Sequence, residues 1–176
     1  NEYYHFYLAG VNYTKRNISQ KYQTNFTVDY SNHISNNNYS NYQKFSLFYL
    51  FDKKISNQST PANLIGKLKY SIIEPTNSSP IYENQYLGGE ELVRGYNPNP
   101  DKNPDEVIDL LKFKNFIYYS LQLEIPWVNE NSIKAKLLFF KDYAIGSNKY
   151  NNFDINNRFS GHGFGCGLKL PNNIQF

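Results

Sequence analysis

Apolar and polar residues alternate along much of this chain with a period of two. The clearest run is at 116–126, where one set of positions is apolar and the other mostly polar: Ile117, Tyr119, Leu121, Leu123 and Ile125 against Tyr118, Ser120, Gln122 and Glu124. Side chains of an extended strand point alternately to its two faces. The run therefore predicts a strand with one apolar and one polar face.

Similar runs lie at 21–30, 64–73, 132–142 and 161–170, and two aromatic-rich, strand-like stretches lie at 2–14 and 42–52. These runs are about ten residues long, which matches a tilted strand that crosses a bilayer rather than the shorter strand typical of globular proteins. Lys, Gln, Asn and Asp within the strands suit a wet lumen. We expect an all-β fold, an antiparallel up-and-down transmembrane β-barrel.

A soluble β-sandwich also has alternating strands, and this alternative stays open on pattern alone. The composition fits either fold: 17 Tyr, 13 Phe and abundant Asn favour strands joined by polar turns. The net charge of +3 is spread along the chain, which argues against a nucleic-acid surface. No stretch approaches the roughly 20 apolar residues of a membrane-spanning helix.

Candidate chemistry is sparse. The histidines stand far apart, and none has metal-ligand spacing with Cys166. The stretch at 101–112 begins like a calcium loop, but Glu106 replaces the glycine of the turn and Lys112 replaces the bidentate glutamate. We therefore expect no catalytic residues, no metal and no cofactor.

Two glycine-rich stretches call for a structural explanation. "GGEELVRGY" at 88–96, followed by "NPNPDKNP", has the glycines and prolines of a loop, yet apolar residues surround its arginine as if the loop packed against something. "GHGFGCG" at 161–167 removes side chains from one face of a strand, which lets another backbone lie close. Between them, Asn103 as N-cap and Pro104 at the first helical position predict a short helix.

These motifs resemble a known family. "GGEELVRGY", "YYSLQLEIP" at 118–126, "KLLFFKDYAIGSNK" at 136–149 and "GHGFGCGLKLP" at 161–171 are similar, in order and spacing, to the C-terminal barrel of the outer-membrane protein assembly and translocation superfamily. That superfamily includes a bacterial barrel-assembly insertase, a mitochondrial sorting-and-assembly barrel and a chloroplast outer-envelope channel. "GSNK" and "GHG" are most similar to the chloroplast channel. Ala144 stands where the family usually has glycine, and residues 1 to 85 match only as generic barrel strands.

The resemblance implies how the parts fit. Residues 1–176 would be the C-terminal part of a larger barrel, and residues 86–115 a loop folded into its lumen. The arginine of the loop would meet an acidic residue on an inward-facing strand, and by position these two residues are Arg94 and Asp142. The period-two pattern agrees, because it places Asp142 on the polar face of its strand. The remaining implied site residues are the turn glycines Gly88, Gly89 and Gly95, the packing residues Val93 and Tyr96, and the lumen glycines Gly163, Gly165 and Gly167.

The implied function is a non-enzymatic channel that translocates preproteins across a plastid-type organellar outer membrane. Its partners would be unfolded precursor polypeptides, membrane lipid and other translocon or assembly subunits, with no nucleic acid. The first alternative is an insertase that assembles β-barrel proteins into a mitochondrial or bacterial outer membrane. The second is a soluble, secreted β-sandwich that binds ligands through its loops.

Overall fold

A computed structural model describes residues 6–19, 21–35, 41–55, 61–75, 83–89, 92–96, 112–129, 134–149, 153 and 158–169. Within these ranges the chain forms the following strands: β1 (Phe6–Ile18), β2 (Tyr22–Ser35), β3 (Tyr42–Lys54), β4 (Asn63–Glu74), β5 (Gln85–Tyr86), β6 (Lys112–Phe113), β7 (Asn115–Asn129), β8 (Lys134–Ser147) and β9 (Arg158–Lys169). No helix in the described part is long and apolar enough to cross a membrane. The short helix expected after Asn103 lies outside the described residues.

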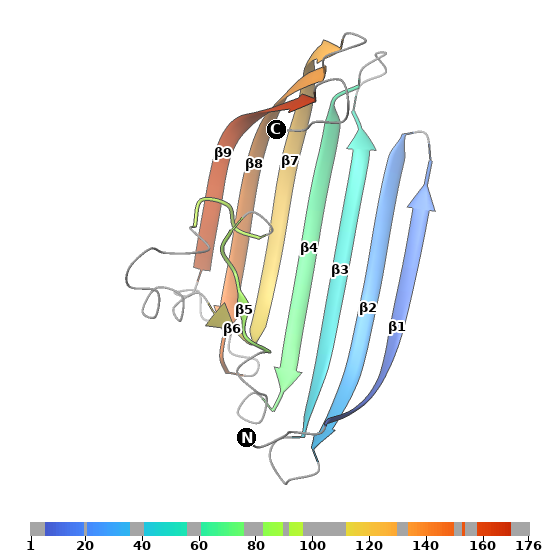
Figure 1. The fold of residues 1–176 in the computed structure, drawn as a ribbon, viewed down its shortest axis with the longest axis vertical. Helices are drawn as coiled ribbons and strands as arrows, with labels where there is room; N and C mark the ends of the chain where they lie inside the picture. The colour runs from blue at the N-terminus through green and yellow to red at the C-terminus, as the bar shows by residue number, and fades with distance from the viewer. Residues whose placement is uncertain are drawn as a thin grey trace.

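Seven of the strands form one antiparallel sheet in the order β1-β2-β3-β4-β7-β8-β9 (Figure 1). Strands that follow one another in the chain are neighbours in this sheet, except where β4 pairs directly with β7. There, β5 and β6 leave the sheet and pair with each other. The all-β prediction is confirmed. The described strands do not close into a barrel, because β1 and β9 are the two edges of an open sheet.

The strands of the large sheet are longer than the alternating runs that predicted them. Strand β7 spans 15 residues; it pairs with β8 along its length and with β4 over residues 116–124. Its pairing with β8 shifts between Pro126 and Val128. Proline has no N–H to donate to a ladder, so a bulge is the ordinary way for a sheet to accommodate it. Because of this shift, the alternation of side chains between the two faces of the sheet ends near Pro126, the last residue of the 116–126 run.

One face of the sheet is mostly apolar and exposed. Residues directly opposite on neighbouring strands share a face, and Leu68, Tyr119 and Tyr143 lie opposite one another across β4, β7 and β8. The large apolar side chains that point to this side and are exposed are Val11, Tyr13, Tyr22, Tyr30, Ile34, Leu68, Tyr119, Leu121, Ile125, Phe139, Phe164 and Leu168. A soluble sandwich would cover such a face with a second sheet. In the described part of the chain no second layer covers it.

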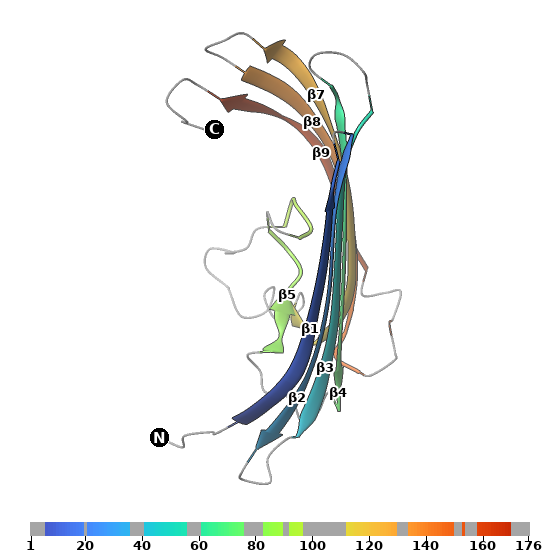
Figure 2. The ribbon, with the colours of Figure 1, turned by 90° about the vertical axis from the view of Figure 1, so that its right-hand side faces the viewer.

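The opposite face is concave, and a segment of the chain lies against it (Figure 2). We call residues 83–89, 92–96 and 112–114, which lie between β4 and β7, the inward segment. The core lies between this segment and the C-terminal strands: Leu87, Leu92, Val93, Phe113, Phe116, Tyr118 and Ala144, with Tyr96 and Phe159 packed against them. The core of this structure therefore lies between a loop and the polar face of a sheet.

Candidate functional site

The site is built on a tight reversal of the inward segment. The backbone N–H of Val93 donates to the carbonyl oxygen of Leu87 at 3.0 Å, and Gly88 and Val93 form an isolated parallel bridge. Gly89 and Gly95 both have a φ of 98°. L-residues with a side chain rarely adopt this conformation. The two glycines thus allow the chain to double back on either side of Val93 and Arg94.

The apolar residues of the reversal pack into the sheet. Leu87 and Val93 are fully buried, and both belong to the cluster that contains Tyr118 and Ala144. The ring of Tyr96 meets that of Phe159 edge to face, with centroids 6.0 Å apart. These contacts explain why a loop rich in glycine carries large apolar side chains: it uses them to attach to the strands.

Arg94 lies beside Asp142 of β8. Its Nε donates to Asp142 Oδ2 at 2.7 Å and its Nη2 to Asp142 Oδ1 at 2.8 Å, so the pair is bidentate. The backbone N–H of Arg94 also donates to Oδ2, at 3.0 Å. The Asp142 side chain is 0% exposed and that of Arg94 is 24% exposed. Bidentate, charge-assisted bonds of this kind fix orientation as well as position.

Neighbouring side chains complete the surroundings of the guanidinium. Nη1 donates to Gln122 Oε1 at 2.6 Å, and Nη2 is 3.3 Å from Ser120 Oγ. Ser120 in turn donates to Asp142 Oδ1 at 2.6 Å. The guanidinium carbon lies 3.7 Å from the centre of the Phe140 ring, a cation–π contact. Strands β7 and β8 together therefore hold Arg94 from several directions.

The polar contacts continue along β7. Gln122 Nε2 donates to Glu124 Oε1 at 2.8 Å, and Lys136 Nζ approaches the same oxygen at 2.9 Å. The concave face carries all four of the polar residues that the period-two pattern assigns to it: Gln122, Glu124, Lys136 and Asp142. A hydrogen-bonded line of side chains thus runs from the arginine toward the end of β7.

Gly161 gives the segment its close approach to β9. A Cβ built there would collide with the carbonyl oxygen of Arg94 and would lie 3.4 Å from Val93 Cγ1. The other glycines of this strand share the face, but their described neighbours differ. A Cβ at Gly163 would meet Phe140 and one at Gly167 would meet Lys136, whereas no described atom lies within 4 Å of one at Gly165. Residues 93–96, expected from the sequence to approach Gly163, Gly165 and Gly167, meet β9 at Gly161 instead: no described atom of the inward segment is among the nearest neighbours of a Cβ at those three glycines.

The arrangement is suited to holding a segment rather than to catalysis. The described residues contain no group of three or more His, Cys, Asp or Glu side chains that could hold a metal ion. The charged groups of the site are engaged with one another, and Asp142 is fully buried. What the site provides is a specific, strong attachment between two parts of one chain.

A sheet that is mostly apolar on its exposed face, polar on its concave face and carries a segment attached to the concave face is typical of the wall of an outer-membrane β-barrel. Residues 22–174 match the Omp85 superfamily domain. The chain belongs to the Omp85 superfamily, whose members are non-enzymatic outer-membrane barrels that assemble or translocate proteins. No curated protein matches the chain.

Sequence reasoning missed several contacts of the site. Ser120, Phe140 and Gly161 all touch the Arg94 pair or its backbone. The period-two pattern placed both Ser120 and Asp142 on the polar faces of their strands, but it did not indicate that the two side chains are in contact. No local signal could have selected Gly161 among the glycines of β9.

Proposed function

We propose that this chain forms part of the wall of a plastid-type channel that translocates preproteins across an organellar outer membrane. In the proposed arrangement the concave face lines a lumen, the convex face meets lipid, and further strands close the barrel. Closure is needed because backbone groups of a sheet edge have no hydrogen-bond partner in a bilayer, and β1 and β9 are edges of the described sheet. Partners would be unfolded precursor polypeptides, lipid and other translocon or assembly subunits.

The observation that carries the proposal is the attachment of the inward segment by Arg94 to the polar face. A segment held there would narrow the lumen of a barrel and expose its own side chains to a polypeptide that passes through the lumen. "GSNK" at 146–149 and "GHG" at 161–163 favour the plastid-type channel within the superfamily. An insertase could have the same fold. The two functions are distinguished by the substrate on which the protein acts.

The test is reconstitution of the full-length protein in liposomes with two kinds of substrate. We expect uptake of a precursor that carries a plastid transit peptide, and no acceleration of the membrane assembly of an unfolded β-barrel protein. Arg94→Ala should reduce uptake, whereas Arg16→Ala, which changes an arginine on the concave face of β1, should not. Barrel assembly without precursor uptake would replace the channel by the insertase.

Arg94→Lys sharpens this test. Lysine keeps the charge but lacks the planar fork that binds both oxygens of a carboxylate. If the bidentate geometry matters, Arg94→Lys should resemble Arg94→Ala in uptake more closely than it resembles the unaltered protein.

A further inference from the structure

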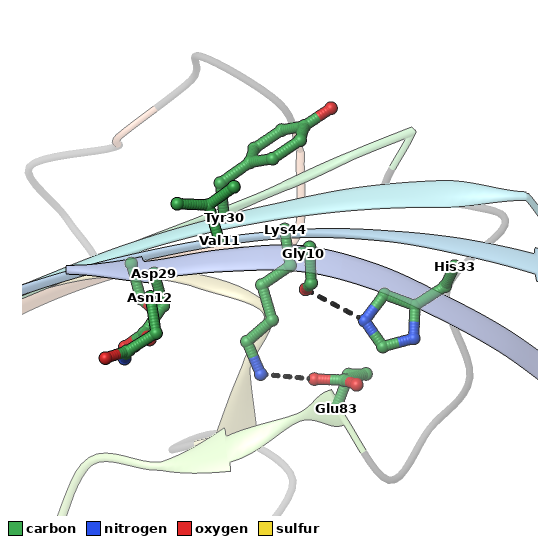
Figure 3. A pocket seen from close by; sticks show the side chains of 10 residues that line it. Gly10, Val11, Asn12, Asp29, Tyr30, His33, Lys44 and Glu83 are labelled. Carbon is green, nitrogen blue, oxygen red and sulfur yellow. Dashed lines mark hydrogen bonds and ion pairs between the residues drawn. The ribbon is translucent and has the colours of Figure 1, made fainter.

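The inward segment touches the sheet at a second place, far from Arg94. Glu83, two residues before β5, extends its carboxylate to β3 (Figure 3). Lys44 Nζ lies 2.6 Å from Glu83 Oε2, and the Tyr42 hydroxyl donates to Oε1 at 2.8 Å. The Glu83 side chain is only 10% exposed, and that of Lys44 is 33% exposed. Both oxygens of this largely buried carboxylate are therefore bound by the same strand.

The tyrosine that receives Glu83 is itself held in place. Tyr42 is 1% exposed and stacks on His33 of β2, with ring centroids 4.2 Å apart and planes 13° from parallel. Ser31 Oγ and His33 Nε2 are 3.0 Å apart. The stacking on His33 of β2 restricts the Tyr42 side chain independently of Glu83, which lowers the entropy lost on forming the contact.

The electrostatics favour an ionised carboxylate. Burial by itself raises the pKa of Glu83, but the hydrogen bonds from Lys44 and Tyr42 and the charge of Lys44 outweigh it, so the pKa lies below its ordinary value. Glu83 is then negative at neutral pH. Its contact with Lys44 is therefore an ion pair at neutral pH.

The first residue after the inward segment is also tied to the sheet. Asn115, at the start of β7, is fully buried, and its Oδ1 accepts from the backbone N–H of Ile73 at 2.7 Å. The segment is thus fastened at its beginning to β3 and at its reversal to β7 and β8, and the residue that follows its end is bonded to β4. Of these attachments, the one at Glu83 lies nearest to β1 and β2.

A cavity of about 620 Å³ lies beside this attachment, over β1, β2 and β3. Glu83 and Lys44 form part of its lining, together with Asn12, Asp29, Ser31 and His33. Figure 3 shows Glu83 reaching the cavity from the inward segment while Asn12 and Asp29 enter it from the sheet. If the carboxylate released β3, the beginning of the segment would be free to move into this space.

We propose that Glu83 is a second anchor of the inward segment: a positioning residue that holds the beginning of the segment on β3 and keeps the space over β1 and β2 open. That this space is part of the path of a translocating polypeptide rests on the function proposed above. The anchor itself rests only on the contacts of Glu83 with Tyr42 and Lys44.

The test measures the position of the segment directly. Spin labels at Ser46 and Gln85, which line one cavity between β3 and β5, are placed in the full-length protein, with Cys166→Ser and serine at every other cysteine that the full-length protein contains. We expect one narrow distance distribution in the parent protein. Glu83→Gln and Glu83→Ala should broaden it, whereas Glu74→Gln, an exposed glutamate at the end of β4, should not. Heat-modified migration in gels checks that each barrel is folded.

A charge exchange makes the test specific. Lys44→Glu alone should broaden the distribution, and Lys44→Glu combined with Glu83→Lys should narrow it again, because the pair is restored with its charges reversed. An unchanged distribution in both Glu83 variants overturns the anchor. So does failure of the exchanged pair to recover in a folded barrel.

Conductance in planar bilayers then tests the path. We expect the current through the open channel to fall in Glu83→Ala, as the segment enters the space over β1 and β2. A broadened distribution with unchanged conductance overturns the role in the path. A parent protein that conducts ions but takes up no precursor would instead overturn the proposed function. The spin-label distances would still test whether Glu83 anchors the segment.

Discussion

Arg94 attaches the inward segment to β7 and β8 through a fully buried carboxylate, a cation–π contact and a surrounding apolar cluster, whereas Glu83 attaches it to β3 through one lysine and one tyrosine. The carboxylates are 0% exposed in Asp142 and 10% in Glu83, and the cations are 24% exposed in Arg94 and 33% in Lys44. Water and salt screen an exposed charge more than a buried one. The first attachment should therefore persist under conditions that release the second.

The largest effect is expected from removing the buried carboxylate. Asp142→Ala leaves Arg94 without its charge partner, and loss of one partner of a buried pair costs about 3–5 kcal/mol. Because the Arg94 side chain is partly exposed, we expect the lower end of this range. Native-state proteolysis of the full-length protein in detergent measures the free energy of opening of the segment.

Two comparisons sharpen this result. The double variant with Arg94→Ala should be little worse than either single variant, because contacting residues are not additive. Asp52→Ala, an aspartate on the concave face of β3, should change the free energy of opening little. Simple additivity of Arg94→Ala and Asp142→Ala would contradict the pairing.

A smaller effect is expected from adding one carbon to β9. In Gly161→Ala the new methyl group would collide with the Arg94 carbonyl, so the segment must shift, at a cost of about 1–3 kcal/mol. Gly165→Ala is the matched control, since no described atom lies near its Cβ position. Equal protease resistance of the two variants would show that the segment does not rest on Gly161.

The smallest effect concerns the ionisation of Glu83. Because its pKa in the folded protein lies below the ordinary value of 4.5, its stabilising contribution is fully present above pH 4.5 and is lost as the pH falls below that value. Hydrogen bonds to a charged group contribute about 1.5–3 kcal/mol, and exposure of Lys44 should bring this contact to the bottom of that range.

The distance between labels at Ser46 and Gln85 should therefore broaden on acidification, and high salt should act in the same direction at neutral pH. The charged and titratable groups that act on Glu83 are Lys44, Tyr42 and His33. Glu83→Gln should remove the pH dependence in the acid range. An identical acid transition in Glu83→Gln would assign it to another group.

The sequence alone determined the strands and their faces. Alternation is a local property, since neighbouring side chains of a strand must point to opposite sides whatever the rest of the fold does. Leu121 and Gln122, or Leu137 and Lys136, are therefore assigned to opposite faces by their positions in the sequence. The pairing of Arg94 with Asp142 came from resemblance to a family, because the two residues lie 48 positions apart and nothing between them brings them together.

The tertiary structure decided what those faces meet. Gly161 lies under Arg94, and Glu83 lies against Tyr42 and Lys44, because the register of the sheet and the course of the inward segment bring them together. The open sheet, with β1 and β9 at its edges, is likewise a property of strand pairing. A period of two assigns a side chain to a face, but only the pairing of distant strands and the packing of the loop between them assign it a neighbour.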